Sequence, residues 1–183
     1  RDPACAGKVV FVGGVDVAPH VRQVRPPRAE AFLTLHFAPG QCAQVDWGSW
    51  GSIRVGNTRR RLSFFALVLC HSRLLYVEFT LGQSQEQWLA CHAHAFETLG
   101  GVPAELMVDN CKTAVLARPP GAAPVFNPTY VDFARHYGFA IKACAPRRPQ
   151  QKGRVENGVG YVKKNFLAGL ELTDFAPLNP AAR

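Results

Sequence analysis

The chain is poor in acidic residues and in methionine. Thirteen Asp and Glu stand against 21 Lys and Arg in 183 residues, so the formal net charge is +8. The sequence has no apolar run of the roughly 18 residues that a membrane span needs, and its first residues have no signal-peptide pattern. Hydrophobic residues make up 48% of the chain, which is a globular composition. So large a positive surplus favours nucleic acid as the partner, and not a membrane.

Paired cysteine motifs are also absent. No two of the six cysteines have the CxxC spacing of a zinc site or a redox motif, which indicates a reducing cytoplasm without disulfides. Cys91, His92 and His94 are close enough in sequence to suggest a metal site. His92 follows Trp88 by four residues on the apolar face of an expected helix, so core packing is favoured over metal binding.

The ends of the chain contrast with its middle. Residues 1–30 lack periodicity and end in the basic, proline-rich stretch 22–30, which indicates an irregular segment and linker. There is no initiating Met, and "PLNPAAR" ends without a cap, so we expect a fragment or a truncated gene product. The expected division is an irregular segment and basic linker over 1–30, a folded domain over 31–173 and a truncated extension over 174–183.

The folded domain begins with a pattern of strands and continues with alternating helices and strands. Strands are expected at 31–37, 42–50, 61–70, 74–80, 106–108 and 139–144, with a loop over 116–128. A helix is expected from a capping box of Ser84 and Gln87 to Leu99, with Gly100 ending it. Further helices are expected from a Thr129 cap to Tyr137 and from Val155 to Leu170. The order predicts an α/β fold with a mixed five-stranded sheet: a three-stranded antiparallel meander, two parallel strands, and helices on both faces.

Three acidic residues occupy positions where they could together form a metal site. Asp46 lies in the first meander strand, Asp109 ends a later strand, and Glu156 is expected in the first turn of the last helix. Adjacent strands would bring Asp46 and Asp109 to one sheet end, where carboxylates suit Mg²⁺ and two ions could clamp a phosphoryl displacement. Each acid also has an ordinary interpretation, as an exposed strand residue, a turn residue or a helix-dipole partner.

Basic and amide side chains surround these acids in sequence. Phosphate contacts are predicted for Arg147, Arg148, Lys152, Arg154, Lys163 and Lys164. Asn110 and Asn157 each follow a carboxylate directly, and we expect them to support the metal-binding groups. A solvated basic loop is the alternative interpretation of this stretch.

Three blocks of sequence carry a family resemblance. "QVDWGSW", "MVDNCKTAV" and "KGRVENGVGYVKKNFL" resemble the signature blocks of the DDE transposase and retroviral integrase catalytic core. The likeness is closest to the larger, IstA-type transposase subunit of two-gene bacterial insertion sequences, and it extends from about Val21 to the end of the chain. In these blocks Asp46, Asp109 and Glu156 correspond to the three catalytic, metal-binding acids.

The resemblance implies an RNase H-like fold over 31–173 and two divalent ions, Mg²⁺ with Mn²⁺ as a substitute. It also implies DNA end cleavage and transfer of a 3′-hydroxyl to target DNA by a bacterial, cytoplasmic, nucleoid-associated protein. The implied partners are element ends, target DNA, further copies of the chain on DNA, and an ATPase helper. Two alternatives remain open: a non-catalytic DNA-binding remnant of a truncated transposase, and an RNase H-type nuclease.

Overall fold

The computed structural model describes residues 11–12, 15–16, 36–109, 111–119, 121–144, 149–168, 175 and 178–181. The chain forms two compact units, Arg1–Thr34 and Leu35–Arg183. The first contains a short antiparallel pair, β1 (Phe11–Val12) and β2 (Val15–Asp16). The remaining described elements belong to the second unit. None of the helices in the described part of the chain is long and apolar enough to cross a membrane.

A mixed five-stranded sheet forms the centre of the second unit. Its strand order is β5-β4-β3-β6-β9. Strands β3, β4 and β5 form an antiparallel meander, and β6 and β9 run parallel to β3. This confirms the predicted sheet. The strands span Cys42–Val55 (β3), Thr58–Leu69 (β4), Leu75–Thr80 (β5), Glu105–Val108 (β6) and Ala140–Ala143 (β9).

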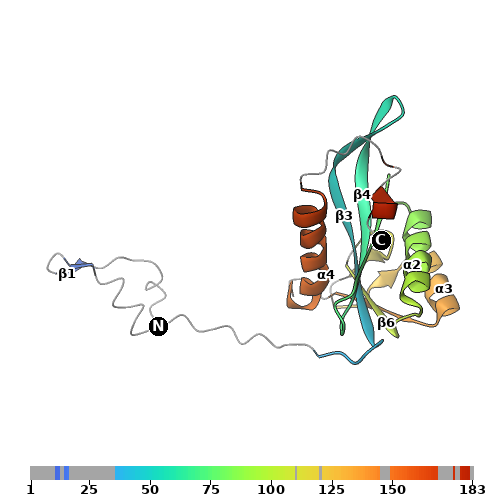
Figure 1. Cartoon of the computed structure of the whole chain (residues 1–183). Helices are drawn as coiled ribbons and strands as arrows, with labels where there is room; N and C mark the ends of the chain where they lie inside the picture. Colours follow the sequence, from blue (N-terminus) through green and yellow to red (C-terminus); the bar gives the residue numbers. More distant parts are fainter. Residues whose placement is uncertain are drawn as a thin grey trace. The chain divides into compact units, whose positions relative to one another are not determined.

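Helices cover both faces of the sheet, as predicted (Figure 1). Helices α2 (Gln85–Leu99) and α3 (Pro128–Tyr137) pack on one face, and α4 (Pro149–Tyr161) with the π-helical turn η2 (Val162–Phe166) packs on the other. A short helix, α5 (Leu178–Ala181), lies near the end of the chain. Strand β4 is buried on both faces: Phe65 and Leu67 join the α2/α3 core, and Phe64 and Val68 join the α4 core.

The caps of the helices explain where α2 and α3 begin and end. Ser84 and Gln87 form the predicted capping box at the start of α2, and Gly100 ends that helix in the left-handed conformation. The predicted Thr129 cap of α3 is wrong. Asn127 caps the helix by accepting a hydrogen bond from the Thr129 backbone N–H, and Pro128 takes the first helical position, which suits its fixed φ.

Several predicted boundaries differ from those of the structure. Strands β3 and β4 extend past the predicted ends into a long arm that turns at Gly56-Asn57. The predicted loop 116–128 contains a small hairpin, β7 (Val115–Ala117) with β8 (Val125–Phe126). The predicted strand 31–37 is not seen at His36 and Phe37, and its residues 31–35 lie outside the described residues.

The last helix also begins earlier than expected, at Pro149 and not at Val155. Proline is favoured in the first turn of a helix, and the Gln-Gln-Lys that follows it favours helix as well. Residues 149–154, interpreted from sequence as part of a basic turn, are therefore helical. Glu156 lies in the middle of α4, and the prediction that it sits in the first helical turn is wrong.

Gly48 is required by the packing of the α4 core. A methyl group added at Gly48 would lie 2.1 Å from Cζ of the Phe64 ring, which covers this glycine from the paired strand. We expect Gly48→Ala to lower the free energy of unfolding by about 1–3 kcal/mol, because the ring must move out of a filled core. Urea unfolding measures this, and adding Phe64→Leu should recover part of the loss.

Gly160→Ala is the matched control, because a methyl group there meets nothing within 4 Å. Alanine in the interior of α4 is expected to be neutral or stabilising, by up to about 1 kcal/mol. Equal destabilisation by the two substitutions would contradict the proposed role of the Phe64 contact.

His92 is a buried, neutral histidine of the α2/α3 core. Its Nδ1–H donates to the Trp88 carbonyl at 2.7 Å, so Nε2 is left to accept the hydrogen bond of the Tyr130 hydroxyl at 3.1 Å. Burial lowers the pKa of His92 to about 4. The sequence-based interpretation of His92 as a core residue agrees with this packing.

The His92 pKa predicts a pH dependence of stability. The unfolded chain binds a proton at this histidine below about pH 6.5, whereas the folded chain resists protonation down to about pH 4. The contribution of neutral His92 to the free energy of unfolding is therefore complete above pH 6.5. It is lost as the pH falls toward 4, and it amounts to about 3 kcal/mol in all. In urea unfolding at several pH values, His92→Phe should show a shallower slope over this range. An unchanged slope in His92→Phe would refute the assignment.

Candidate active site

Asp46 and Asp109 lie where the parallel pairing of β3 with β6 ends, Asp46 inside the longer strand β3 and Asp109 just after β6. Val45 of β3 pairs with Val108 of β6, and each aspartate is the next residue along its chain. Side chains alternate along β3, so Ala43 and Val45 face the α2/α3 core while Gln44 and Asp46 face the side that α4 covers. Both aspartates are partly exposed. The two strands are adjacent, as predicted, and both aspartates lie where solvent can reach them; that their carboxylates share a metal ion stays a prediction.

The charges of both aspartates act on the thiol of Cys111. Burial raises the pKa of its thiol, and the negative charges of Asp46 and Asp109 raise it further. Both carboxylates are thus close enough to act on one sulfur. Cys111 was not predicted to lie near the site, although it follows Asp109 by two residues in the sequence.

Gln44 joins the three elements that carry the predicted acids. Its side-chain Oε1 accepts the backbone N–H of Val155 in α4 at 3.0 Å, and its Nε2 lies 3.9 Å from the Met107 sulfur in β6. Gln44 is itself buried, two residues before Asp46. One side chain therefore fixes α4 against the sheet next to Glu156. Nothing in the sequence distinguished Gln44 from any other polar strand residue.

Glu156 follows this anchored position but is itself exposed. Within the described ranges, no three His, Cys, Asp or Glu side chains are grouped closely enough to hold a metal ion. The structure therefore brings Asp46 and Asp109 together as a pair and does not group Glu156 with them.

The predicted phosphate-binding residues are only partly described. Arg147, Arg148 and Asn110 lie outside the described residues, as does the side chain of Lys152. Lys163 is half-buried and Lys164 is exposed in η2. Arg154 places its guanidinium 4.6 Å from the centre of the Phe37 ring.

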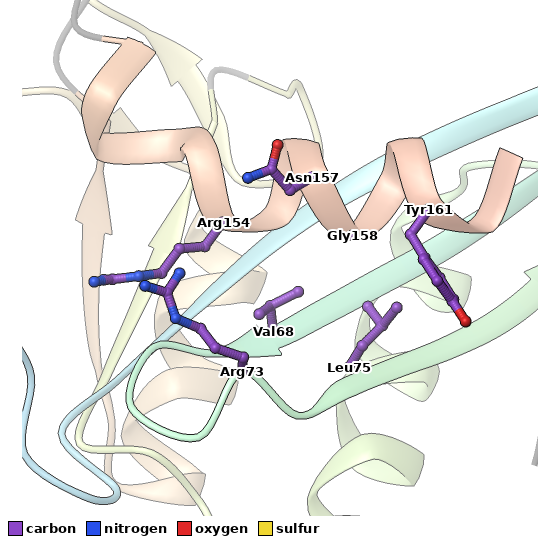
Figure 2. A pocket seen from close by; sticks show the side chains of 7 residues that line it. All are labelled: Val68, Arg73, Leu75, Arg154, Asn157, Gly158 and Tyr161. Atoms are coloured by element: carbon purple, nitrogen blue, oxygen red, sulfur yellow. The ribbon is translucent and has the colours of Figure 1, made fainter. Parts of the chain in front are cut away.

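Arg154 and Asn157 line a groove between α4 and the β4–β5 turn, and Glu156 is not among the residues that line it (Figure 2). One residue along an α-helix is a rotation of about 100°. The expectation that Asn157 supports the carboxylates therefore receives no support from its position in this groove.

The chain belongs to the integrase core domain family, which matches residues 36–149. The match includes Asp46 and Asp109 and ends before Glu156. The chain is 35% identical over 146 residues to the transposase for insertion sequence element IS21 of Pseudomonas aeruginosa, covering 80% of this chain and 36% of that protein. It is also 35% identical over 146 residues to the transposase for IS640 of Shigella sonnei, covering 80% of this chain and 45% of that one.

Solved structures share the fold. The catalytic core domain of BIV integrase matches with a TM-score of 0.54 at 16% identity, over 78% of each chain. The HTLV-2 integrase catalytic core domain, solved in complex with magnesium, matches with a TM-score of 0.55 at 16% identity, over 78% of this chain and 83% of that one. The second unit is therefore RNase H-like. The chain spans less than half the length of the two transposases, at 36% and 45%.

The Gln44 contact predicts a specific loosening of α4. Gln44→Met keeps the length of the side chain but removes the oxygen that accepts the Val155 N–H, together with the amide nitrogen that donates to the Met107 sulfur. We expect a loss of about 1–3 kcal/mol in the free energy of unfolding, since a buried hydrogen-bond partner disappears. Hydrogen exchange should also become faster in α4.

Gln41→Met serves as the control, because Gln41 is exposed and its oxygen accepts the N–H of the nearby Ala38. Its effect should stay within about 0.5 kcal/mol. If exchange in α4 is the same in Gln44→Met and Gln41→Met, Gln44 does not anchor the helix.

Proposed function

We propose that this chain is the catalytic core of a DNA transposase, which cleaves DNA and transfers strands in a metal-dependent reaction. The observation that carries the proposal is the placement of Asp46 and Asp109, each directly after the last paired residues, Val45 and Val108, of two parallel strands. The family match over these residues and the likeness to insertion-sequence transposases support it. The net charge of +8 suits a polyanionic substrate.

The donor set of the proposed site fits a hard divalent cation. Asp46 and Asp109 supply carboxylate oxygens, which Mg²⁺ and Mn²⁺ prefer, and no soft ligand is needed. We assign Glu156 as the third carboxylate, on a helix that Gln44 anchors. When bound, one or two such ions supply charge stabilisation at the phosphate and activation of the attacking oxygen.

The chain's own residues position the substrate in this proposal. Each step exchanges one phosphorus–oxygen bond for another: water attacks in end cleavage, and the element's 3′-hydroxyl attacks in strand transfer. The attacking hydroxyl gives up a proton, and the leaving 3′-oxygen takes one up.

Lys163 and Lys164 follow Glu156 along the chain and offset phosphate charge. Arg147, Arg148, Lys152 and Arg154 are proposed for the same task.

The proposed partners follow from strand transfer itself. Two DNA segments, the element end and the target, must meet at one core, and joining both ends of an element requires more than one copy of the chain. We also propose an ATPase helper and a cytoplasmic, nucleoid-associated location in a bacterium. The names of the transposase relatives support the DNA substrate and do not bear on the helper.

One observation favours a second candidate function, a DNA-binding remnant without catalysis. Glu156 is not grouped with the aspartate pair among the described residues. A chain that cannot bring this carboxylate to the other two would retain its basic surface and lose its chemistry. Strand joining separates the two candidates.

The test is a strand-joining assay with a pre-cut element end of a related insertion sequence, with Mg²⁺ or Mn²⁺. We expect the wild-type chain to join strands only with metal, and Asp109→Asn and Glu156→Gln to lose joining. Asp132→Asn is the matched control, because Asp132 is an exposed surface acid paired with Arg135. A wild-type chain that binds DNA but never joins it would support the remnant and contradict the transferase.

Metal binding should also be visible in thermal stability. Asp109→Asn removes one proposed ligand together with one of two neighbouring negative charges. Without metal it should melt no lower than wild type, yet its melting temperature should rise less with added Mg²⁺ or Mn²⁺, because metal binds the folded state more weakly. Melting curves at constant ionic strength measure both effects. The same metal-induced rise in wild type and Asp109→Asn would remove Asp109 from the metal site.

A further inference from the structure

A groove runs between α4 and the turn that joins β4 to β5. It encloses about 440 Å³. Its apolar floor consists of Val68 and Leu75, and Gly158 of α4 lies directly above them (Figure 2). A methyl group at Gly158 would come within 3.0 Å of Val68 and 3.2 Å of Leu75, so the glycine sets how closely the helix approaches this floor.

Two arginines form one end of the groove. Arg73 belongs to the β4–β5 turn and Arg154 to α4, and Figure 2 shows their guanidinium groups extending toward the same end. Both positive charges act on the thiol of Cys70. The hydrogen bond with Cys42 is the largest cause that lowers the pKa of this thiol to about 7. The hydrogen bond and charge of Arg154 lower it further, as does the charge of Arg73. The three ion pairs among the described residues leave Arg73 without a carboxylate. This end therefore suits an anion.

The backbone at Arg73 has a fixed and unusual conformation. Its φ is 65°, and among the described non-glycine residues it is the one with a positive φ. Its N–H donates to the Leu69 carbonyl at 3.0 Å, which closes the turn. The turn therefore fixes the point beside the groove at which the Arg73 side chain leaves the backbone.

An exposed aromatic ring forms the other end. Tyr161 of α4 is 62% exposed and lines the groove at the end away from the arginines (Figure 2). A cationic end for a phosphate, an apolar floor and an open aromatic face together match how proteins hold single-stranded nucleic acid. A duplex keeps its base faces stacked and cannot offer them to this ring.

We propose that this groove binds single-stranded DNA, with a phosphate between Arg73 and Arg154 and a base stacked on Tyr161. The choice of DNA as the ligand rests on the proposed function. Cleavage and transfer act on one strand of an element end, so the complementary strand has to be held aside. The groove provides a place for that strand along α4, lined by residues of the helix that do not include Glu156.

The test is binding of a fluorescent oligothymidylate to the 183-residue chain, followed by anisotropy over a range of salt concentrations. Tyr161→Ala should weaken binding about tenfold with the salt slope unchanged, because stacking is lost and no charge changes. Tyr161→Phe should bind like wild type. Arg73→Asn should weaken binding and lower the salt slope by roughly 0.7. Asparagine is used because it tolerates the positive φ at this position.

Two controls isolate the groove from the general charge of the protein. Arg60→Asn removes one exposed positive charge from the β3–β4 arm and should weaken binding less than Arg73→Asn. An abasic oligonucleotide has the same phosphates without bases, so it should bind wild type about as weakly as Tyr161→Ala binds the full oligonucleotide.

The outcomes separate this proposal from the proposed function. If Tyr161→Ala binds the oligonucleotide as tightly as wild type, or Arg73→Asn loses no more than Arg60→Asn, the groove is not the single-strand site, whether or not the chain joins strands. If the two groove variants lose binding as expected while wild type never joins strands, the groove proposal stands and the transferase proposal fails.

Discussion

The parallel pairing of β3 with β6 is the interaction on which the rest of the site depends. Strand β3 sits between β4 and β6, so it takes part in both the antiparallel meander and the parallel half of the sheet. The register that pairs Val45 with Val108 also sets Asp46 beside Asp109. A shift of one residue would turn Asp46 toward the α2/α3 core, where an uncompensated carboxylate is costly. The buried apolar residues of both strands thus specify the position of two charges.

Helix α4 is attached to this sheet by two unlike contacts. The Gln44 side chain accepts a backbone N–H of α4, and Gly158 lets the helix approach Val68 and Leu75 closely. These contacts also set the rotation of the helix about its axis. Arg154 and Tyr161 consequently line the groove beside β4 and β5, while Glu156 is left outside it. The proposed metal site and the proposed single-strand site therefore use different faces of one helix.

Local patterns predicted much of the fold because local physics decides those features. The capping box at Ser84, the left-handed end at Gly100 and the apolar run of β4 all took the predicted form. The errors arose where two neighbouring signals compete. Helix α3 begins at Pro128 with Asn127 as its cap, and not with the predicted cap Thr129. Helix α4 begins at Pro149, in a basic stretch that was expected to precede the helix. The β7–β8 hairpin forms in a proline- and glycine-rich segment whose two strands are three and two residues long.

The sequence by itself determined the α/β class, the strand order of the meander, and the choice of Asp46, Asp109 and Glu156 as candidate acids. Residue type and periodicity carry that information, because a strand repeats every two residues and a helix every 3.6. Only the tertiary structure decided that Gln44 anchors α4, that Cys111 lies near both aspartates, and that Arg73 and Tyr161 line opposite ends of one groove. These contacts join residues from different elements, and their geometry depends on helix rotation and strand register, which no local pattern contains.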